Sequence, residues 1–192
     1  MRMSHRVLVA YASTHGHTAK IADRIGAVLR DRRCPARARP LGGSGPRLDL
    51  SQFDAFIVGA SVHAGHHQRE VVEWISEHRT TLSMHPSAFF SVSLTAADDT
   101  EEARVATRSM IDDVLVETGW TPQETVAFAG ALQFKEYNLP TRVLMRLIAR
   151  RIEHHTGTPV DVHEDTDYTD WAAVDHFAEA FAAGLDRPEV AS

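Results

Sequence analysis

A chain of 192 residues, 43% of them hydrophobic and 24% charged, has the composition of a globular protein and the length of one well-buried domain. Its net charge of −6 argues against a nucleic-acid partner, because proteins that bind DNA or RNA carry a basic surface. Cys34 has no second cysteine to pair with, and we find neither a signal peptide nor an apolar run long enough to cross a bilayer, so we expect a cytoplasmic protein with an inert structural thiol.

The first elements of the chain are predicted to be a strand, a polar loop and a helix. Residues 7–12 are an apolar run typical of a buried parallel strand, and apolar side chains return at helical spacing from Ile21 to Leu29. The loop between them supplies hydroxyl groups, a glycine where the backbone can bend, and the first N–H groups of the helix, which together can hold a monophosphate. Its residues are Ser13, Thr14, His15, Gly16, His17 and Thr18.

An ordinary strand-to-helix turn with a Ser/Thr cap would have the same composition, so the loop alone leaves both interpretations open. Two other kinds of phosphate site are excluded by missing signatures. The loop lacks the Gly-Lys-Ser/Thr of triphosphate sites, and the chain lacks the Gly-x-Gly-x-x-Gly of dinucleotide sites.

The rest of the chain continues the alternation of strands and helices. The first helix should end near Arg32, and apolar patterns predict the following elements: an edge strand at 34–41, central strands at 54–61, 87–94 and 125–132, and helices at 70–78, 101–118 and 171–185. In the 101–118 helix we expect these residues to face the core: Val105, Met110, Ile111, Val114 and Leu115. Thr169 is the predicted N-cap of the last helix.

This order of elements predicts an α/β fold in which a parallel sheet is covered on both faces. Five strands, with the first in the centre, fit a doubly wound sheet of order 2-1-3-4-5, which binds ligands beyond the carboxyl ends of its strands. Three loops should reach that edge: 13–18, 61–67 and 94–99. We expect a single domain over residues 1–192, with an insert at about 133–168 that is too long for an ordinary connection.

The polar loop resembles the flavodoxin phosphate loop, Ser/Thr-x-Thr-Gly-x-Thr, with His15 where flavodoxins usually place a threonine. Further stretches at 59–67, 86–94, 129–132 and 168–171 resemble the flavodoxin-like protoporphyrinogen IX dehydrogenases, which are bacterial FMN enzymes. The resemblance covers nearly the whole chain and includes a basic, apolar insert before the final helix. It implies a flavodoxin-like doubly wound five-stranded sheet with a helical insert.

The resemblance also implies a cofactor, a reaction and a set of site residues. FMN would be bound through its phosphate at residues 13–18, and the enzyme would oxidise protoporphyrinogen IX and pass the electrons to a quinone in heme biosynthesis. No side chain is needed as a dedicated acid or base, because the flavin carries the chemistry. The residues implied to line the isoalloxazine are Ser61, Val62, His63, Ala64, Gly65, Ser91, Val92, Ser93, Leu94 and Thr95.

Two alternatives remain open on the same resemblance: a flavodoxin-type electron carrier and a general FMN quinone reductase. Carriers usually hold the flavin between aromatic rings and surround it with carboxylates, whereas the second loop here offers His63 and the third offers Leu94. We hypothesise that this histidine-containing rim with few acids stabilises reduced flavin. His63, His66 and His67 could instead bind a metal, but they lack a clear fourth ligand; we expect no metal and expect His66 and His67 to be exposed.

The insert contains an amphipathic segment at 141–152, predicted to be a helix. Its arginines recur at four-residue spacing on one face: Arg142, Arg146 and Arg150. Three roles are open. The helix could pack on its own domain or in a homodimer, lie on the anionic inner face of the cell membrane, or cap the flavin and pair with carboxylates of a porphyrinogen-like substrate.

Overall fold

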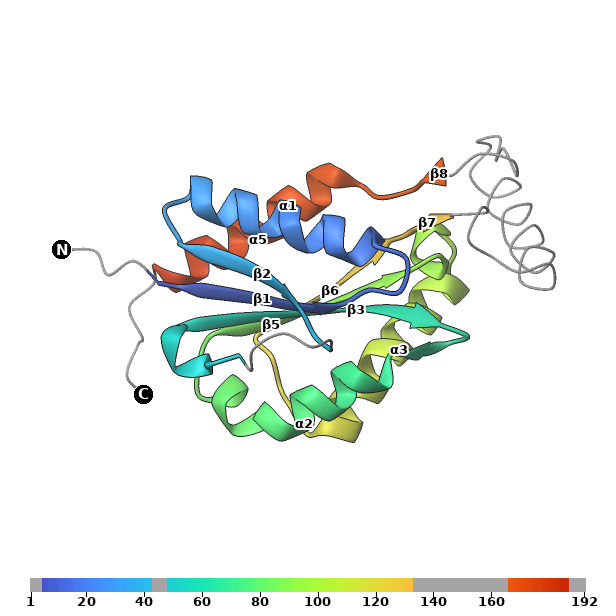
Figure 1. Ribbon diagram of the computed structural model, residues 1–192. Helices are drawn as coiled ribbons and strands as arrows, with labels where there is room; N and C mark the ends of the chain where they lie inside the picture. The colour runs from blue at the N-terminus through green and yellow to red at the C-terminus, as the bar shows by residue number, and fades with distance from the viewer. Residues whose placement is uncertain (1–4, 43–47, 133–165, 187–192) are drawn as a thin grey trace.

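The computed structural model describes residues 5–42, 48–132 and 166–186. They form a parallel sheet between two layers of helices (Figure 1). The strands are β1 (Val7–Ala12), β2 (Ala36–Pro40), β3 (Ala55–His63), β4 (His66–His67), β5 (Ser87–Ser93), β6 (Glu124–Ala129), β7 (Ala131–Leu132) and β8 (Thr166–Asp167). The helices are α1 (His17–Asp31), α2 (Arg69–Ser83), α3 (Glu101–Thr118) and α5 (Trp171–Leu185), with short 3₁₀ turns η1 (Leu50–Gln52) and η2 (Thr95–Ala97).

The central strands lie in the order β2-β1-β3-β5-β6, and every neighbouring pair in this path is parallel. This confirms the predicted 2-1-3-4-5 order. In the middle of the sheet, Val7 of β1 is paired with Ala36 of β2 on one side and with Ala55 of β3 on the other. The polar strand β2 lies at one edge, as predicted, and β6 lies at the other.

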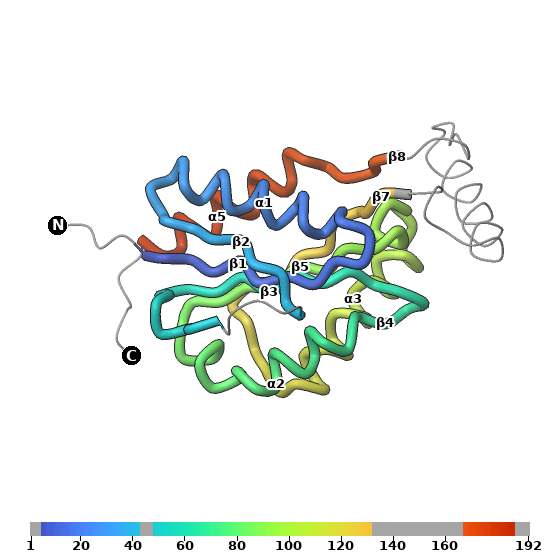
Figure 2. Tube along the Cα trace, viewed as in Figure 1, coloured from blue at the N-terminus to red at the C-terminus, as the bar shows by residue number. Residues whose placement is uncertain are grey.

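The core is divided by the sheet into two apolar clusters, one on each face. Val7 and Val9 of β1 pack toward α1 and α5, whereas Leu8 and Ala10 pack toward α2 and α3. Figure 2 shows the same two pairs of helices on opposite sides of the strands. Because all four side chains are at most 1% exposed, both faces of β1 must be apolar, which explains its unbroken hydrophobic sequence.

The stretch predicted as a loop at 62–67 is instead a β-hairpin. β3 continues to His63, and β4 returns antiparallel beside it. The turn between them is made by Ala64 and Gly65, with φ angles of 50° and 83°. Two consecutive left-handed residues match the twist of a tight hairpin, but Ala-Gly lacks the asparagine or aspartate that usually marks such a turn.

The strand predicted at 125–132 is interrupted at Gly130. β6 ends at Ala129, and β7 leaves the main sheet to pair antiparallel with β8, so that Ala131 lies opposite Asp167. The start of α5 is thereby held beside the end of β6.

The prediction that Val105 faces the core is wrong, because this side chain is 59% exposed. The buried stripe of α3 passes through Ala103, Thr107 and Ile111 at four-residue spacing, and Val105 lies about half a turn away from it.

The predicted helical insert, with Arg142, Arg146 and Arg150, lies outside the described residues except for 166–168. None of the helices in the described part of the chain combines the length and the apolarity needed to span a bilayer.

Candidate functional site

The carboxyl ends of β1, β3, β5 and β6 point to the same edge of the sheet (Figure 1). Four features follow these strand ends: the loop before α1, the β3–β4 hairpin, η2, and the β7–β8 ribbon. In an open parallel sheet, this edge at the β1/β3 switch point is where ligands bind. The predicted site loops are therefore brought together here.

The first loop leaves donors without partners at the start of α1. The helix begins at His17 after Gly16, which has a φ of 78°, and no side chain accepts a hydrogen bond from the first N–H groups of the helix. The Ser13 hydroxyl is buried with no partner among the described residues, and Thr18 is 1% exposed. Free N–H groups at the positive end of a helix dipole, beside an unpaired hydroxyl, form a site for a phosphate group.

Gln68 connects the first loop to the hairpin. Its side-chain amide donates to the Thr14 hydroxyl at 3.0 Å and accepts from the Ser61 backbone N–H at 3.1 Å. Gln68 cannot be recognised as a site residue from the sequence, because a lone glutamine just before a helix has no motif around it. Gln68 fixes the spacing between the two loops.

His17 faces away from the first loop and toward the start of α5. Its Nε2 lies 2.7 Å from the Thr169 hydroxyl, which itself donates to the Ala129 carbonyl at 2.8 Å. Nε2 must therefore be the donor, which leaves Nδ1 as a buried acceptor without a partner among the described residues. Burial lowers the pKa of His17, and the opposing effect of Asp167 is smaller.

The contacts of His17 show that the predicted N-cap of α5 is wrong, and they limit how His17 can bind a phosphate. Thr169 does not cap α5; Asp170 does so by accepting the backbone N–H groups of Ala172 and Ala173. The ring of His17 is committed to Thr169, so only the backbone of His17 is available to a ligand in the first loop.

The hairpin presents His63 to the first loop. The rings of His63 and His15 meet edge to face, with centroids 5.7 Å apart, and His63 Nε2 lies 3.3 Å from the Ser61 hydroxyl. Burial lowers the pKa of His63, and the neighbouring His15 lowers it further. Both effects favour the uncharged form of the His63 imidazole.

His67 is buried, at 9% exposure, so the expectation that it is exposed is wrong. Its Nε2 lies 2.8 Å from the Ser91 hydroxyl, and its ring packs edge to face on Phe89. Burial lowers the pKa of His67 to about 4, despite the opposing charge of Asp113. A two-residue strand is too short for a hydrophobic pattern to show which way its side chains point. His66 is exposed, as predicted.

The end of β5 and the third loop that follows it differ in burial. Ser91, Val92 and Ser93 are at most 6% exposed; the Ser91 hydroxyl is bound to His67, and the Ser93 hydroxyl accepts from the backbone of Ala96. The half-buried Leu94 and the start of η2 remain accessible to a ligand.

Within the described residues, no three histidine, cysteine or acidic side chains lie close enough together to share a metal ion. His67 is held inside the fold, whereas His66 lies on the exposed side of the hairpin. The arrangement at this edge is suited to an anionic, phosphate-bearing ligand.

Comparisons with known proteins agree with this geometry. A family model described as the flavodoxin domain matches residues 8–159. Protoporphyrinogen IX dehydrogenase (quinone) of Leishmania major is 37% identical over 186 residues, which cover 94% of this chain and 76% of that protein. The protein of the same name in Escherichia coli strain K12 is 28% identical over 186 residues, which cover 95% of this chain and 98% of that protein. The crystal structure of flavodoxin 2 from Bacillus cereus superposes with a TM-score of 0.54 at 22% identity, covering 93% of this chain and 99% of that one.

Proposed function

Because the chain belongs to the flavodoxin domain family, we propose that it is an FMN-dependent oxidoreductase that oxidises protoporphyrinogen IX to protoporphyrin IX and passes the electrons to a quinone. Family membership supports a flavin, and the two relatives named for this reaction support the substrate and the acceptor. Both relatives align with nearly the whole chain, so the likeness extends beyond the shared fold.

The observation that carries the proposal is the unsatisfied first loop. A phosphate dianion there would accept hydrogen bonds from the buried Ser13 hydroxyl and from the uncapped N–H groups at the start of α1. Gly16 already has the left-handed φ that lets the backbone curve around such a group. FMN ends in a monophosphate and therefore fits this loop.

We assign the ring of the flavin to the space between the hairpin and η2. Ser61 to Gly65 and Leu94 to Thr95 would face the ring, whereas Ser91 to Ser93 would support them from inside the sheet. The flavin supplies the two-electron chemistry when bound, and this chain binds it, orients it and limits its contact with water.

The phosphate part of the proposal is tested by comparing FMN with riboflavin, which lacks the phosphate. In Ser13→Ala, FMN affinity should fall by about 10-fold or more, because a hydrogen bond to a charged group contributes about 1.5–3 kcal/mol. Riboflavin affinity should not change, and the apoprotein should not be destabilised, because the lost hydroxyl has no partner. Ser109→Ala, at an exposed position on α3, is the matched control. An unchanged FMN affinity in Ser13→Ala would contradict the assignment of the loop.

The reaction is tested with FMN-loaded protein, protoporphyrinogen IX and a menaquinone analogue, mixed without oxygen. The expected result is porphyrin fluorescence that grows at a rate proportional to protein concentration. Tight FMN binding without porphyrin formation would favour an electron carrier. Quinone reduction driven only by a nicotinamide cofactor would favour a general quinone reductase.

A further inference from the structure

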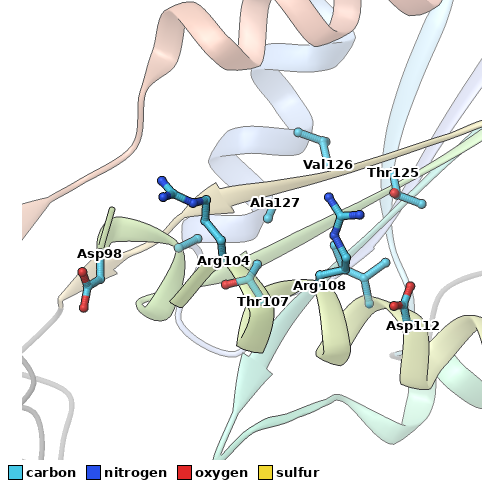
Figure 3. Close-up of a pocket in the computed structure, with 10 residues that line it drawn as sticks. Asp98, Arg104, Thr107, Arg108, Asp112, Thr125, Val126 and Ala127 are labelled. Carbon is cyan, nitrogen blue, oxygen red and sulfur yellow. The ribbon is translucent and has the colours of Figure 1, made fainter. Parts of the chain in front are cut away.

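A groove between α3 and the edge strand β6 lies beside the proposed flavin site and plays no part in it (Figure 3). Its cavity measures about 470 Å³, which is within the range of pockets that hold small organic ligands. Ala96 and Asp98 form one end of the groove. Since Ala96 belongs to η2, the groove begins where the proposed ring site ends.

Two arginines on α3 line the groove, one helical turn apart. Arg104 is held by Asp99 at 2.6 Å and by Glu101 at 3.2 Å, so its charge is already compensated. Arg108 forms no ion pair with any described residue, and in Figure 3 its guanidinium group lies beside β6. Arg108 therefore offers a positive charge to a ligand in the groove.

Neither of the two acidic side chains that line the groove forms an ion pair with Arg108. Asp98 accepts the backbone N–H of Thr100, and its carboxylate points away from both arginines in Figure 3. Asp112 lies one turn beyond Arg108 on α3, and the two side chains form no ion pair. Arg108 is therefore left without an ion-pair partner among the described residues.

Thr107 adds an unsatisfied polar group to the same wall. It is 6% exposed, and its hydroxyl has no hydrogen-bond partner among the described residues. A buried hydroxyl without a partner costs about 1–3 kcal/mol, so a bound acceptor would recover that energy. Ile111 and Ala127 give the groove an apolar lining beside this hydroxyl.

An unpaired cation, an unpaired hydroxyl and an apolar wall together match a carboxylate attached to an apolar body. We propose that the groove between α3 and β6 binds a carboxylate arm of the substrate, with Arg108 pairing the carboxylate and the Thr107 hydroxyl donating to it. The rest of the substrate then extends past η2 toward the flavin. This inference rests on the proposed function, because a porphyrinogen is an apolar ring system that carries carboxylate arms.

The test is direct binding of protoporphyrin IX and of its dimethyl ester to the FMN-loaded protein, followed by porphyrin fluorescence. The native protein should bind the diacid about 10-fold more tightly than the ester, since a charge-assisted hydrogen bond is lost in the ester. Arg108→Gln should bind both forms equally, and Thr107→Val should lose a smaller part of the preference. Arg37→Gln, at an exposed position on β2 at the opposite edge of the sheet, should keep the native preference.

Two results would contradict carboxylate binding in the groove. The first is a preference for the diacid that survives in Arg108→Gln, and the second is a preference that Arg37→Gln loses to the same extent. FMN content, measured from the visible spectrum of each variant, separates this test from that of the proposed function. In one outcome, FMN binds and porphyrinogen is oxidised while Arg108→Gln changes neither the diacid preference nor the KM for porphyrinogen. That result would support the proposed function and contradict carboxylate binding in the groove. If FMN binds and the diacid preference depends on Arg108 but porphyrinogen is not oxidised, the carboxylate site is supported and the proposed reaction fails.

Discussion

The buried His67 should make the stability of the fold depend on pH. Its pKa is about 4 in the folded protein, against 6.5 for an ordinary histidine, because burial disfavours the charged form. The unfolded chain therefore takes up a proton first as the pH falls. The contribution of His67 to the free energy of unfolding is fully present above about pH 6.5 and is lost as the pH falls from there to about 4. Below about pH 4 the free energy of unfolding stays lower by a constant amount.

The size of this effect follows from the shift in pKa, at about 1.4 kcal/mol per unit. Lowering the pH from about 7.5 to about 5 should cost about 2 kcal/mol through His67, and the full loss below pH 4 is about 3 kcal/mol. His17 and His63 also have lowered pKa values and add to the total. The contribution of His67 must therefore be measured as a difference between proteins.

Urea unfolding of the native protein and of His67→Gln at about pH 7.5 and about pH 5 gives that difference. At the higher pH, the variant should be less stable by about 1–2 kcal/mol, because the buried Ser91 hydroxyl loses its partner. At the lower pH, this deficit should disappear. His78→Gln, at a half-buried position on α2, serves as the control. If His67→Gln loses as much stability on acidification as the native protein does, the argument from burial is refuted.

Three further predictions concern backbone positions and can be checked by urea unfolding. Gly59→Ala should cost about 3 kcal/mol, because the new Cβ would lie 1.9 Å from the fully buried ring of Phe90, whereas Gly184→Ala in open space on α5 should cost nothing. Ala64→Gly should raise the unfolding free energy by about 0.5 kcal/mol, since it relieves a left-handed alanine but adds freedom to the unfolded chain. Gly16→Ala should cost about 1 kcal/mol and weaken FMN binding more than riboflavin binding, which titration of both ligands would show.

The strands and helices could be predicted because each long apolar pattern depends on many residues at once. β1 and β5 are buried on both faces, and α1 and α5 repeat apolar residues at helical spacing, so the type of each element followed from its own pattern. The strand order followed from these elements together with the resemblance to flavodoxins. These predictions depend on many residues at once. An error at one position, as at Val105, therefore left the fold unaffected.

The details of the site could not be predicted in the same way, because single contacts decide them. The pairing of β7 with β8 joins segments far apart in the chain, and the turn at Ala64 lacks the usual residues of a tight hairpin. The bonds from Gln68 to Thr14 and from His67 to Ser91 depend on how the loops lie in space. The hydroxyl-rich first loop could be recognised because its hydroxyl groups and its glycine are close together in the sequence, at 13–18.

The lowered pKa of His63 bears on how the hairpin and η2 would favour a reduced flavin. A cationic His63 would attract a negatively charged ring, but burial and His15 both lower the pKa of His63 and so disfavour that cation. If a flavin binds here as proposed, the rim would act on it through its few carboxylates rather than through a positive charge on His63. Asp98 and Asp99 are the acids nearest to η2, and they are engaged by the backbone of Thr100 and by Arg104. With few free carboxylates to repel it, a reduced flavin would be less destabilised here than in an acidic rim, and a negative ring would itself raise the pKa of His63 and draw a proton to the hairpin.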